Sequence, residues 1–474
     1  MTRRLAFCLA AVLPGIAHAQ STLTDHPSPT RDVSQPPTLT IDRYREDWSV
    51  LADPEKRTGR WTEPFKYIPL DANGSVYLTT GLEVRVRNEN YDNLQWGSHP
   101  APDQGYLWTR LLPYADLHVG QARAFVQPII AYASGVKPRA GPTDETGVDM
   151  LQAFVNYDFD LGGGKVLRFA AGRQMLSLGS ERLIGTRYGV NIPLAYDGGR
   201  VILLTPRFGM TSFYLKPVEA GPRSFDDRSS HNRAVWGAYA TRWLDPAHKT
   251  GFDLYYLGFR NAQARYDQGS GREVRHTLGV RSFGVHDQWR WNVEGMYQFG
   301  QFAGAPIRAW SFSTALGYRF DGVPLTPDLS TSFGVVSGDR DRNRPGLQRF
   351  NALFPKGKYF GELSPIGPAN IIGVHPQIGI HPMQKVTFSV AGMAYWRQSL
   401  GDGVYDVPGN LLRSGAGSRA RFIGKQAEAV VGWQATPELN LSASASLFKA
   451  GRFIAETGPA RTIHMLGLEA NFRY

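Results

Sequence analysis

Hydrophobic and polar residues alternate one by one in many segments of this chain. The final segment sets apolar residues at the even positions 466–474 against polar or small residues at the odd positions between them. The same alternation occupies 76–87 and 439–447. A period of two places side chains on alternate faces of a β-strand, so each segment predicts a strand with one apolar and one polar face. For the last segment, the alternative is an edge strand of a soluble sandwich.

Segments of this kind recur along the chain at a length of about 9 to 11 residues, the length at which a tilted strand crosses a bilayer. They predict about 18 strands, and the alternation is weakest at 195–217 and 372–381. The predicted strands are 76–88, 105–118, 122–133, 148–159, 165–175, 195–205, 209–217, 232–243, 250–260, 273–284, 289–300, 307–319, 328–338, 372–381, 385–397, 420–434, 438–449 and 462–474.

The connections between these strands alternate in length. Short ones lie at 120–121, 206–208, 286–287, 381–383 and 435–437, and long ones lie at 89–104, 176–194, 339–371 and 398–419. Alternating short turns and long loops are typical of a transmembrane antiparallel β-barrel with periplasmic turns and external loops. We therefore expect an all-β closed barrel, because closure removes the exposed strand edges of an open sheet. The order of short turns and long loops places both termini in the periplasm.

The N-terminus has the pattern of a secretory leader. Arg3 and Arg4 precede an apolar run at 5–16, and the small residues Ala17 and Ala19 mark a cleavage site. The sequence predicts a signal peptide at 1–19, a disordered lead-in at 20–40 rich in Pro, Ser and Thr, a periplasmic segment at 41–75 and the barrel at 76–474. Together with the barrel, this leader predicts that the chain is located in the outer membrane of a Gram-negative cell.

The sequence offers little for catalysis. Its single cysteine, Cys8, lies in the leader, so the mature chain would have no thiol for a disulfide, a thiolate metal site or a nucleophile. Gly162 to Gly164 lie between two predicted strands and predict a tight turn, while His375 and His381 fit a strand and a turn better than a metal site. We expect no enzyme activity, no cofactor and no metal, with a barrel-embedded hydrolase as the alternative.

Basic residues exceed acidic ones, by 52 to 41, and removal of the leader would leave a formal charge of about +9. On the clearest strands, arginines fall on the polar face: Arg85, Arg87, Arg110, Arg123 and Arg168. A charge on the lipid face near mid-bilayer costs about 2–4 kcal/mol, so these residues are predicted to line the lumen. Glu83, Asp116 and Asp197 are the predicted charge partners. The alternative is that the excess basic residues face lipopolysaccharide or solvent.

Several motifs resemble those of the alginate export family of outer-membrane barrels. They are RYREDW at 43–48, DPEKRT at 53–58, KYIPL at 66–70, GRQ at 172–174, DGGR at 197–200, SGDRD at 337–341, FNALFPK at 350–356 and YFGE at 359–362. The resemblance implies a monomeric barrel that passes an anionic polysaccharide, with Arg85, Arg123, Arg173 and Arg200 at a constriction and Asp197 as a partner. Strict alternation places Arg173 opposite Arg168 unless a bulge lies near Gly172.

We expect an outer-membrane channel for passive export of an alginate-like, uronate-rich polysaccharide through an arginine-lined lumen. An uptake porin for small organic anions is the main alternative, and the hydrolase is the third. The predicted partners are the anionic permeant, outer-membrane lipids including lipopolysaccharide, the barrel-insertion machinery and periplasmic export proteins. No nucleic acid is expected to bind.

Overall fold

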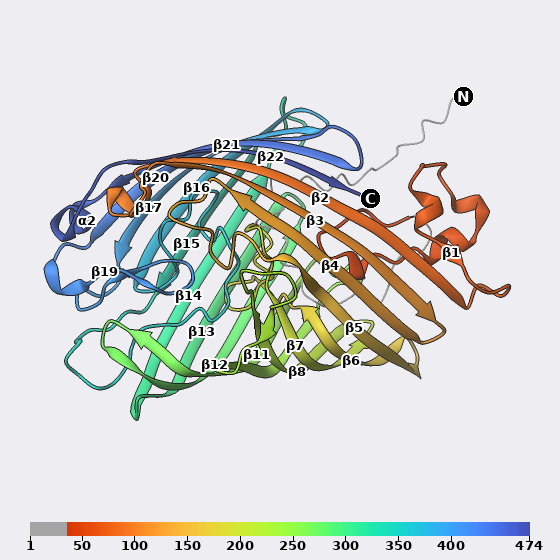
Figure 1. Ribbon diagram of the computed structural model, residues 1–474, viewed down its shortest axis with the longest axis horizontal. Helices are drawn as coiled ribbons and strands as arrows, with labels where there is room; N and C mark the ends of the chain where they lie inside the picture. The colour runs from red at the N-terminus through yellow and green to blue at the C-terminus, as the bar shows by residue number, and fades with distance from the viewer. Residues whose placement is uncertain (1–35) are drawn as a thin grey trace.

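The computed structural model describes residues 36–474, in which 18 long antiparallel strands form a closed barrel (Figure 1). Closure is made by β2 (Val76–Asp92), which pairs with β3 (Gln104–Val119) on one side and with β22 (Ile463–Arg473) on the other. The predicted all-β barrel and its strand number are confirmed. The predicted leader at 1–19 and most of the lead-in at 20–40 lie outside the described residues.

The strands follow one another around the wall in chain order. The other long strands are β4 (Ala122–Ser134), β5 (Gly147–Gly162), β6 (Lys165–Met175), β7 (Ala195–Thr205), β8 (Phe208–Glu219), β10 (Arg233–Trp243), β11 (Gly251–Tyr266), β12 (Gly269–His286), β13 (Trp289–Phe302), β14 (Ala305–Arg319), β15 (Asp328–Val336), β16 (Ile371–Met383), β17 (Val386–Arg397), β20 (Phe422–Gln434) and β21 (Leu439–Ala450). The segments with weak alternation, 195–217 and 372–381, are thus strands.

Short elements lie before the first long strand and between the long strands. They are β1 (Ile68–Pro69), β9 (Arg228–Ser229), β18 (Val404–Tyr405), β19 (Leu411–Arg413), the helix α2 (Arg452–Thr457) and the 3-10 turns η1 (Arg43–Arg45), η2 (Ser49–Ala52), η3 (Pro54–Lys56), η4 (Glu63–Phe65), η5 (Leu94–Gly97) and η6 (Gly415–Gly417). Among the described residues, no helix has the length and apolar content needed to cross a membrane.

The barrel is apolar outside and charged inside. Outward side chains such as Leu254 and Leu468 are 63% and 61% exposed, whereas Arg110, Asp253 and Glu294 are buried in the interior. Each strand makes both surfaces because successive residues point to opposite faces. The alternation read from the sequence therefore determines which charges enter the lumen.

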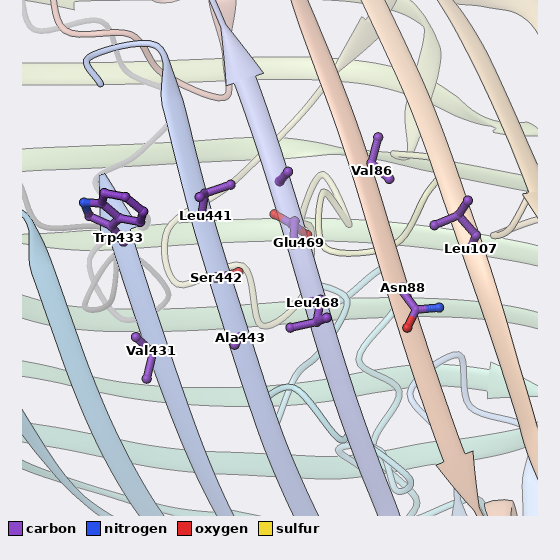
Figure 2. A pocket seen from close by; sticks show the side chains of 11 residues that line it. Val86, Asn88, Leu107, Val431, Trp433, Leu441, Ser442, Ala443, Leu468 and Glu469 are labelled. Carbon is purple, nitrogen blue, oxygen red and sulfur yellow. The ribbon is translucent and has the colours of Figure 1, made fainter. Parts of the chain in front are cut away.

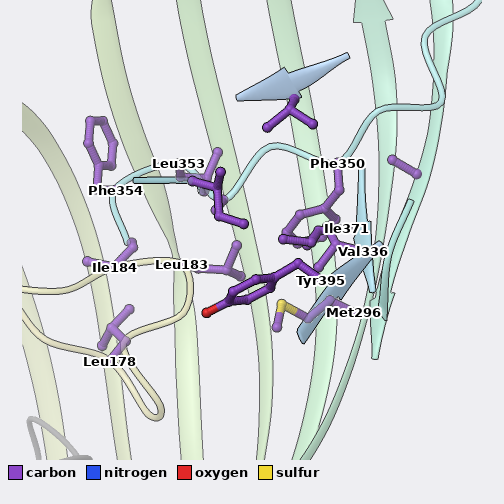
Figure 3. Close-up of a cluster of buried hydrophobic side chains, with 14 of the residues drawn as sticks. Leu178, Leu183, Ile184, Met296, Val336, Phe350, Leu353, Phe354, Ile371 and Tyr395 are labelled. Atoms are coloured by element: carbon purple, nitrogen blue, oxygen red, sulfur yellow. The ribbon is translucent and has the colours of Figure 1, made fainter. Parts of the chain in front are cut away.

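Two long loops fold into the barrel and form its main apolar cluster. Leu183 and Ile184 from loop 176–194 pack with Phe354 from loop 337–370, and wall residues such as Met296 and Tyr395 surround them (Figure 3). The loops bury their hydrophobic side chains against each other and against apolar residues on the inner face of the wall, such as Tyr239, Leu257 and Met296. The interior is consequently crossed by protein rather than left as an open tube.

The described N-terminal segment, 36–75, lies at the barrel end that carries the short turns. Arg43 is buried there and donates a hydrogen bond of 2.6 Å to the carbonyl of Tyr474, the last residue. Lys66 is also buried and donates to the Tyr114 hydroxyl at 2.8 Å. Burial, reinforced by the charge of Arg43, lowers the pKa of Lys66 to about 7. Both described chain ends therefore meet at one rim, whose assignment to the periplasm stays a prediction.

β1 explains why this segment is held at the seam. It pairs with β2 at Ile68↔Leu78, whereas β22 begins its pairing with β2 only at Glu83↔Arg473. Without β1, the residues of β2 that precede its pairing with β22 would leave one edge unpaired. Covering that edge satisfies backbone groups that a barrel in a membrane cannot leave open.

Substituting Arg43→Met should loosen the N-terminal segment without unfolding the barrel. Arg43 forms a 3.3 Å ion pair with the buried Glu46, and removing one partner of a buried pair costs about 3 kcal/mol. Trypsin cleavage after Arg57 should accelerate by roughly a hundredfold if this segment opens locally.

The control is Glu55→Gln, which removes a charge from an exposed position of the same segment. Cleavage of Arg43→Met at the wild-type rate would contradict the role of this buried pair.

Candidate functional site

Loop 176–194 spans the lumen from one side of the wall to the other. At one side its Tyr188 and Val190 carbonyls accept hydrogen bonds from Arg85 of β2, at 2.9 and 2.7 Å. At the other side the Ser180 hydroxyl donates to Glu294 of β13. Because the strands follow chain order around the barrel, β13 lies opposite β2. The loop therefore crosses the lumen rather than lying along one wall.

A part of loop 337–370 crosses the lumen beside it. Phe354 pairs with Ile184 in a parallel bridge, its amide donates to the Leu183 carbonyl at 2.8 Å, and its carbonyl accepts from Gly185 at 2.9 Å. Residues 176–194 and 350–362 together are named the crossbar below. These backbone bonds make the two segments one unit, so a movement of either segment would carry the other with it.

The wall arginines Arg85 and Arg110 hold the crossbar in place. Arg85 has its two hydrogen bonds on the loop carbonyls, and Arg110 donates to the Val190 carbonyl at 3.1 Å. Arg110 also pairs with Glu83 at 2.7 Å. Both guanidinium groups are almost completely buried. They point inward as the alternation predicts, but they lie beneath the loop instead of facing open water.

Arg87 anchors the other crossing segment. It forms ion pairs with Glu89 and Glu469 of the wall and with Glu362 of the crossbar, at 2.5, 2.8 and 2.5 Å. Lys358 of the crossbar pairs with Glu89 at 2.8 Å and with Glu362 at 2.7 Å. Two cations and three carboxylates thus form one network that ties the crossbar to β2 and β22.

Arg123 and Arg168 lie near the short turns, away from the crossbar. Arg123 forms a two-pronged ion pair with Asp116, with 2.7 Å between its Nε and one carboxylate oxygen. Arg168 pairs in the same way with Asp158, with both bonds at 2.6 Å. Asp116 therefore partners an arginine, and Asp158 is a partner that the strand pattern did not indicate.

Arg173 and Asp197 form a pair apart from the other arginines. Their side chains meet at 2.9 Å, and they register with one another across β6 and β7. The ladders beside Gly172 run without a register shift, so Arg173 takes the face opposite to Arg168. Gly172 adopts a φ of 130°, but it adds no residue to the strand. Arg200 is buried and takes the same face as Arg168, since Ala170 is its partner.

The crossbar contributes charged residues to the lumen that strand periodicity cannot reveal. Arg187 is held at a φ of 53°, in the left-handed region that non-glycine residues rarely occupy. Within the described part of the chain the one hydrogen bond of its side chain goes to the Pro355 carbonyl at 3.4 Å, and the side chain forms no ion pair. The signal available in the sequence was the basic character of 176–194 and 350–358.

The outer part of loop 337–370 is fastened by two buried carboxylates. The Asp339 amide donates to Asp402 at 3.0 Å, and the Asp339 carboxylate accepts from the Gln348 amide at 2.6 Å. Burial and the nearby Asp402 charge raise the pKa of Asp339 to about 7, and burial raises that of Asp402 as well. This pairing joins the loop to its neighbour at 398–421.

One acidic group among the described residues has the spacing of metal ligands. Asp149, Asp226 and Asp227 bring carboxylate oxygens within 4.8 Å of one another. Arg173 lies 3.6 Å from Asp149, and the Asp227 carboxylate accepts a hydrogen bond from Thr146. Because these contacts already serve the carboxylates, the group is a set of loop contacts.

A recess of about 480 Å³ lies on the outer surface of the barrel (Figure 2). Its apolar lining includes Val86, Leu107, Val431 and Leu468, which belong to the outward face of their strands. The recess is therefore part of the lipid-facing surface, separate from the lumen.

Comparison with known proteins adds a family and a fold. The sequence profile of the alginate export family matches residues 76–467. A search of curated proteins finds no match. Similar solved structures include OccK2 of Pseudomonas aeruginosa in complex with glucuronate, with a TM-score of 0.55 and 11% identity over 86% of this chain and 99% of that chain.

Two further structures are similar. OccK8 of Pseudomonas aeruginosa has a TM-score of 0.55 and 12% identity over 84% of this chain and 98% of that chain. A BenF-like porin from Pseudomonas fluorescens Pf-5 has a TM-score of 0.57 and 10% identity over 84% and 98% of the two chains. At these identities the likeness shows the fold alone.

Replacing Gly185 by valine should separate the two crossing segments. A Cβ at this glycine would lie 3.0 Å from the Lys356 amide nitrogen and 3.1 Å from the Glu181 Cβ, so the segments must move apart. We expect single-channel conductance in planar bilayers to rise at least about twofold as the lumen widens.

The matched control is Gly392→Val, since nothing lies within 4 Å of a Cβ at that position. Folded Gly185→Val protein with wild-type conductance would show that the crossbar does not limit the pore.

Proposed function

This chain belongs to the alginate export family, and from that premise we propose that it is a passive outer-membrane channel for an anionic, uronate-rich polysaccharide. The family and the BenF-like porin are transport proteins, which favours a channel over a barrel-embedded hydrolase. Channels of this type need no covalent step. Their selectivity depends on the charges and the width of the lumen.

The observation that carries the proposal is the position of Arg187 on the crossbar. Most wall arginines already have carboxylate partners, as Arg110, Arg123 and Arg168 illustrate. Arg187 stands in the lumen without such a partner among the described residues, and Arg233 approaches the same Phe354 ring, each guanidinium carbon lying 5.9 Å from the ring centroid. A cation without its own anion attracts a permeant anion, so the crossbar supports selectivity for anions.

A uronate suits this arrangement better than a simple ion does. A guanidinium presents paired N–H donors that match the two oxygens of a carboxylate, and a uronate polymer repeats that carboxylate along its length. Several cations of moderate affinity would let such a chain advance from one to the next. OccK2 was solved in complex with glucuronate, which lends support through the shared fold.

A second candidate is an uptake porin for small organic anions. The crossbar narrows the lumen and is tied at both sides, which favours a small permeant over a polymer. The direction of transport, the monomeric state and the roles of lipopolysaccharide, insertion machinery and periplasmic export proteins remain predictions from the sequence. Block of the channel by a mannuronate trimer but not by monomeric glucuronate would favour the exporter.

Substituting Arg187→Glu should reduce or reverse the preference for anions. The change replaces the unpaired cation of the crossbar with an anion, and a lumen charge acts strongly on permeation because the surroundings are low in dielectric. The measurement is the reversal potential of the full chain in planar bilayers under a salt gradient, where we expect a severalfold fall in the anion-to-cation permeability ratio.

Arg207→Glu is the matched control, because Arg207 is exposed at a short turn outside the lumen. An unchanged permeability ratio in Arg187→Glu would refute the proposal that the crossbar sets the selectivity.

A further inference from the structure

Tyr44 of the N-terminal segment is inserted into the inner wall of the barrel near the short turns. Its ring meets those of Phe154 and Phe125 edge-on, with centroids 4.9 and 5.8 Å apart. Its hydroxyl donates to the Asn156 side-chain carbonyl at 2.8 Å. Its backbone carbonyl accepts a 2.6 Å hydrogen bond from Arg123, whose guanidinium carbon also lies 3.9 Å from the ring centroid.

The surrounding wall residues form what is named here the Tyr44 socket. Arg123, Phe125, Phe154, Asn156 and Arg168 make it up, and Arg168 places its guanidinium carbon 5.8 Å from the Tyr44 ring centroid. The five residues come from β4, β5 and β6, so the barrel wall alone builds the socket. The N-terminal segment supplies the Tyr44 side chain that fills it and the Tyr44 backbone carbonyl that Arg123 contacts.

The socket offers the groups that bind a sugar acid. Two aromatic rings provide an apolar surface for the C–H face of a pyranose, and the Asn156 amide can bond a hydroxyl group. The guanidinium groups of Arg123 and Arg168 use two nitrogens each on Asp116 and Asp158, and their remaining N–H groups can donate to an oxygen of the sugar acid. Tyr44 satisfies the same groups with one flat ring, one hydroxyl and one carbonyl oxygen. It therefore imitates a ring with polar substituents.

We propose that the Tyr44 socket is a subsite for one uronate residue of the permeant and that the N-terminal segment occupies it until the permeant displaces Tyr44. This inference rests on the proposed function, since it takes the uronate polymer as permeant. It adds a binding site and a competing segment at the short-turn mouth of the barrel.

The wall of the socket does not need Tyr44 to keep its shape. Arg123 is oriented by Asp116 and Arg168 by Asp158, and each of these pairs is two-pronged. The socket would therefore remain in place after the tyrosine leaves. A preformed site binds with less ordering cost than one that must assemble around its ligand.

Departure of Tyr44 leaves groups that require a new partner. The Arg123 donor that serves the Tyr44 carbonyl would become unsatisfied in the interior, and an unsatisfied buried donor costs free energy until water or a ligand accepts its hydrogen. An oxygen of an incoming sugar acid can replace the lost carbonyl. The segment and the permeant therefore compete for the same donors.

The experiment uses the full chain in planar bilayers with a mannuronate trimer as the probe. In Tyr44→Ala the ring and the hydroxyl leave the socket while the backbone carbonyl of residue 44 stays, so the trimer concentration that halves the current should fall about tenfold. Adding Phe154→Ala to Tyr44→Ala should abolish that gain, because one aromatic surface of the socket is lost. Maltotriose, which has no carboxylate, should block wild type and Tyr44→Ala equally weakly.

Trp61→Ala is the control for general loosening of the segment. Trp61 is 57% exposed and stacks on the outward Phe472, so it lies outside the socket, and its loss should leave block unchanged. The inference is overturned if the trimer blocks Tyr44→Ala only as strongly as wild type. It is also overturned if the double variant stays as sensitive as Tyr44→Ala, or if maltotriose gains as much as the trimer.

The block by the trimer and the anion preference, measured on the same channels, distinguish this inference from the proposed function. A wild-type channel without anion preference would contradict the proposed function itself. Anion preference retained together with unchanged block in Tyr44→Ala would contradict the socket alone.

Discussion

Satisfaction of backbone hydrogen bonds in a closed ladder is the constraint on which the rest of this structure depends. Within lipid no water can serve a free N–H or C=O group, so the first long strand, β2, must pair with the last, β22. Closure in turn leaves each strand with one face toward lipid and one toward the lumen. Charged residues such as Glu83 and Arg110 then have only the inward face available, which concentrates charge inside the barrel.

Concentrated charge explains how the lumen is organised. Charged residues facing one another at short range are stable only if opposite signs are interleaved, and the wall pairs Arg110 with Glu83 and Arg123 with Asp116. Carbonyl oxygens of the crossbar supply the remaining acceptors for Arg85. Of the arginines predicted to line the lumen, Arg85, Arg87 and Arg110 therefore position the crossbar. In the function proposed above, the selectivity passes to residues that the crossbar presents, above all Arg187.

The seam that closes the barrel also accounts for the N-terminal segment. Where β22 ends, β2 continues and exposes an edge, and β1 covers it while Arg43 binds the last residue of the chain. Held in this way, the segment places Tyr44 against the inner wall. The segment that covers the free edge of β2 thus also places Tyr44 at the short-turn end of the lumen.

The sequence by itself determined the strands, their number and the inward direction of Arg85, Arg110 and Arg123. These features depend on the alternation of successive side chains between the two faces of a strand, so a local pattern is sufficient to reveal them. Its motifs also indicated the family that the profile match over 76–467 establishes. Even the face of Arg173, opposite to Arg168, follows from simple alternation once the ladder is known to run without a shift.

Only the tertiary structure decided what those inward side chains meet. The contacts of Arg85 with Val190, of Arg87 with Glu362 and of Tyr44 with Asn156 join residues at least about a hundred positions apart, and nothing local specifies them. The path of a long loop depends on where its apolar residues find partners, and in this barrel the partners of Ile184 lie in another loop. Periodicity describes the wall, whereas the lumen is built by segments that have no period.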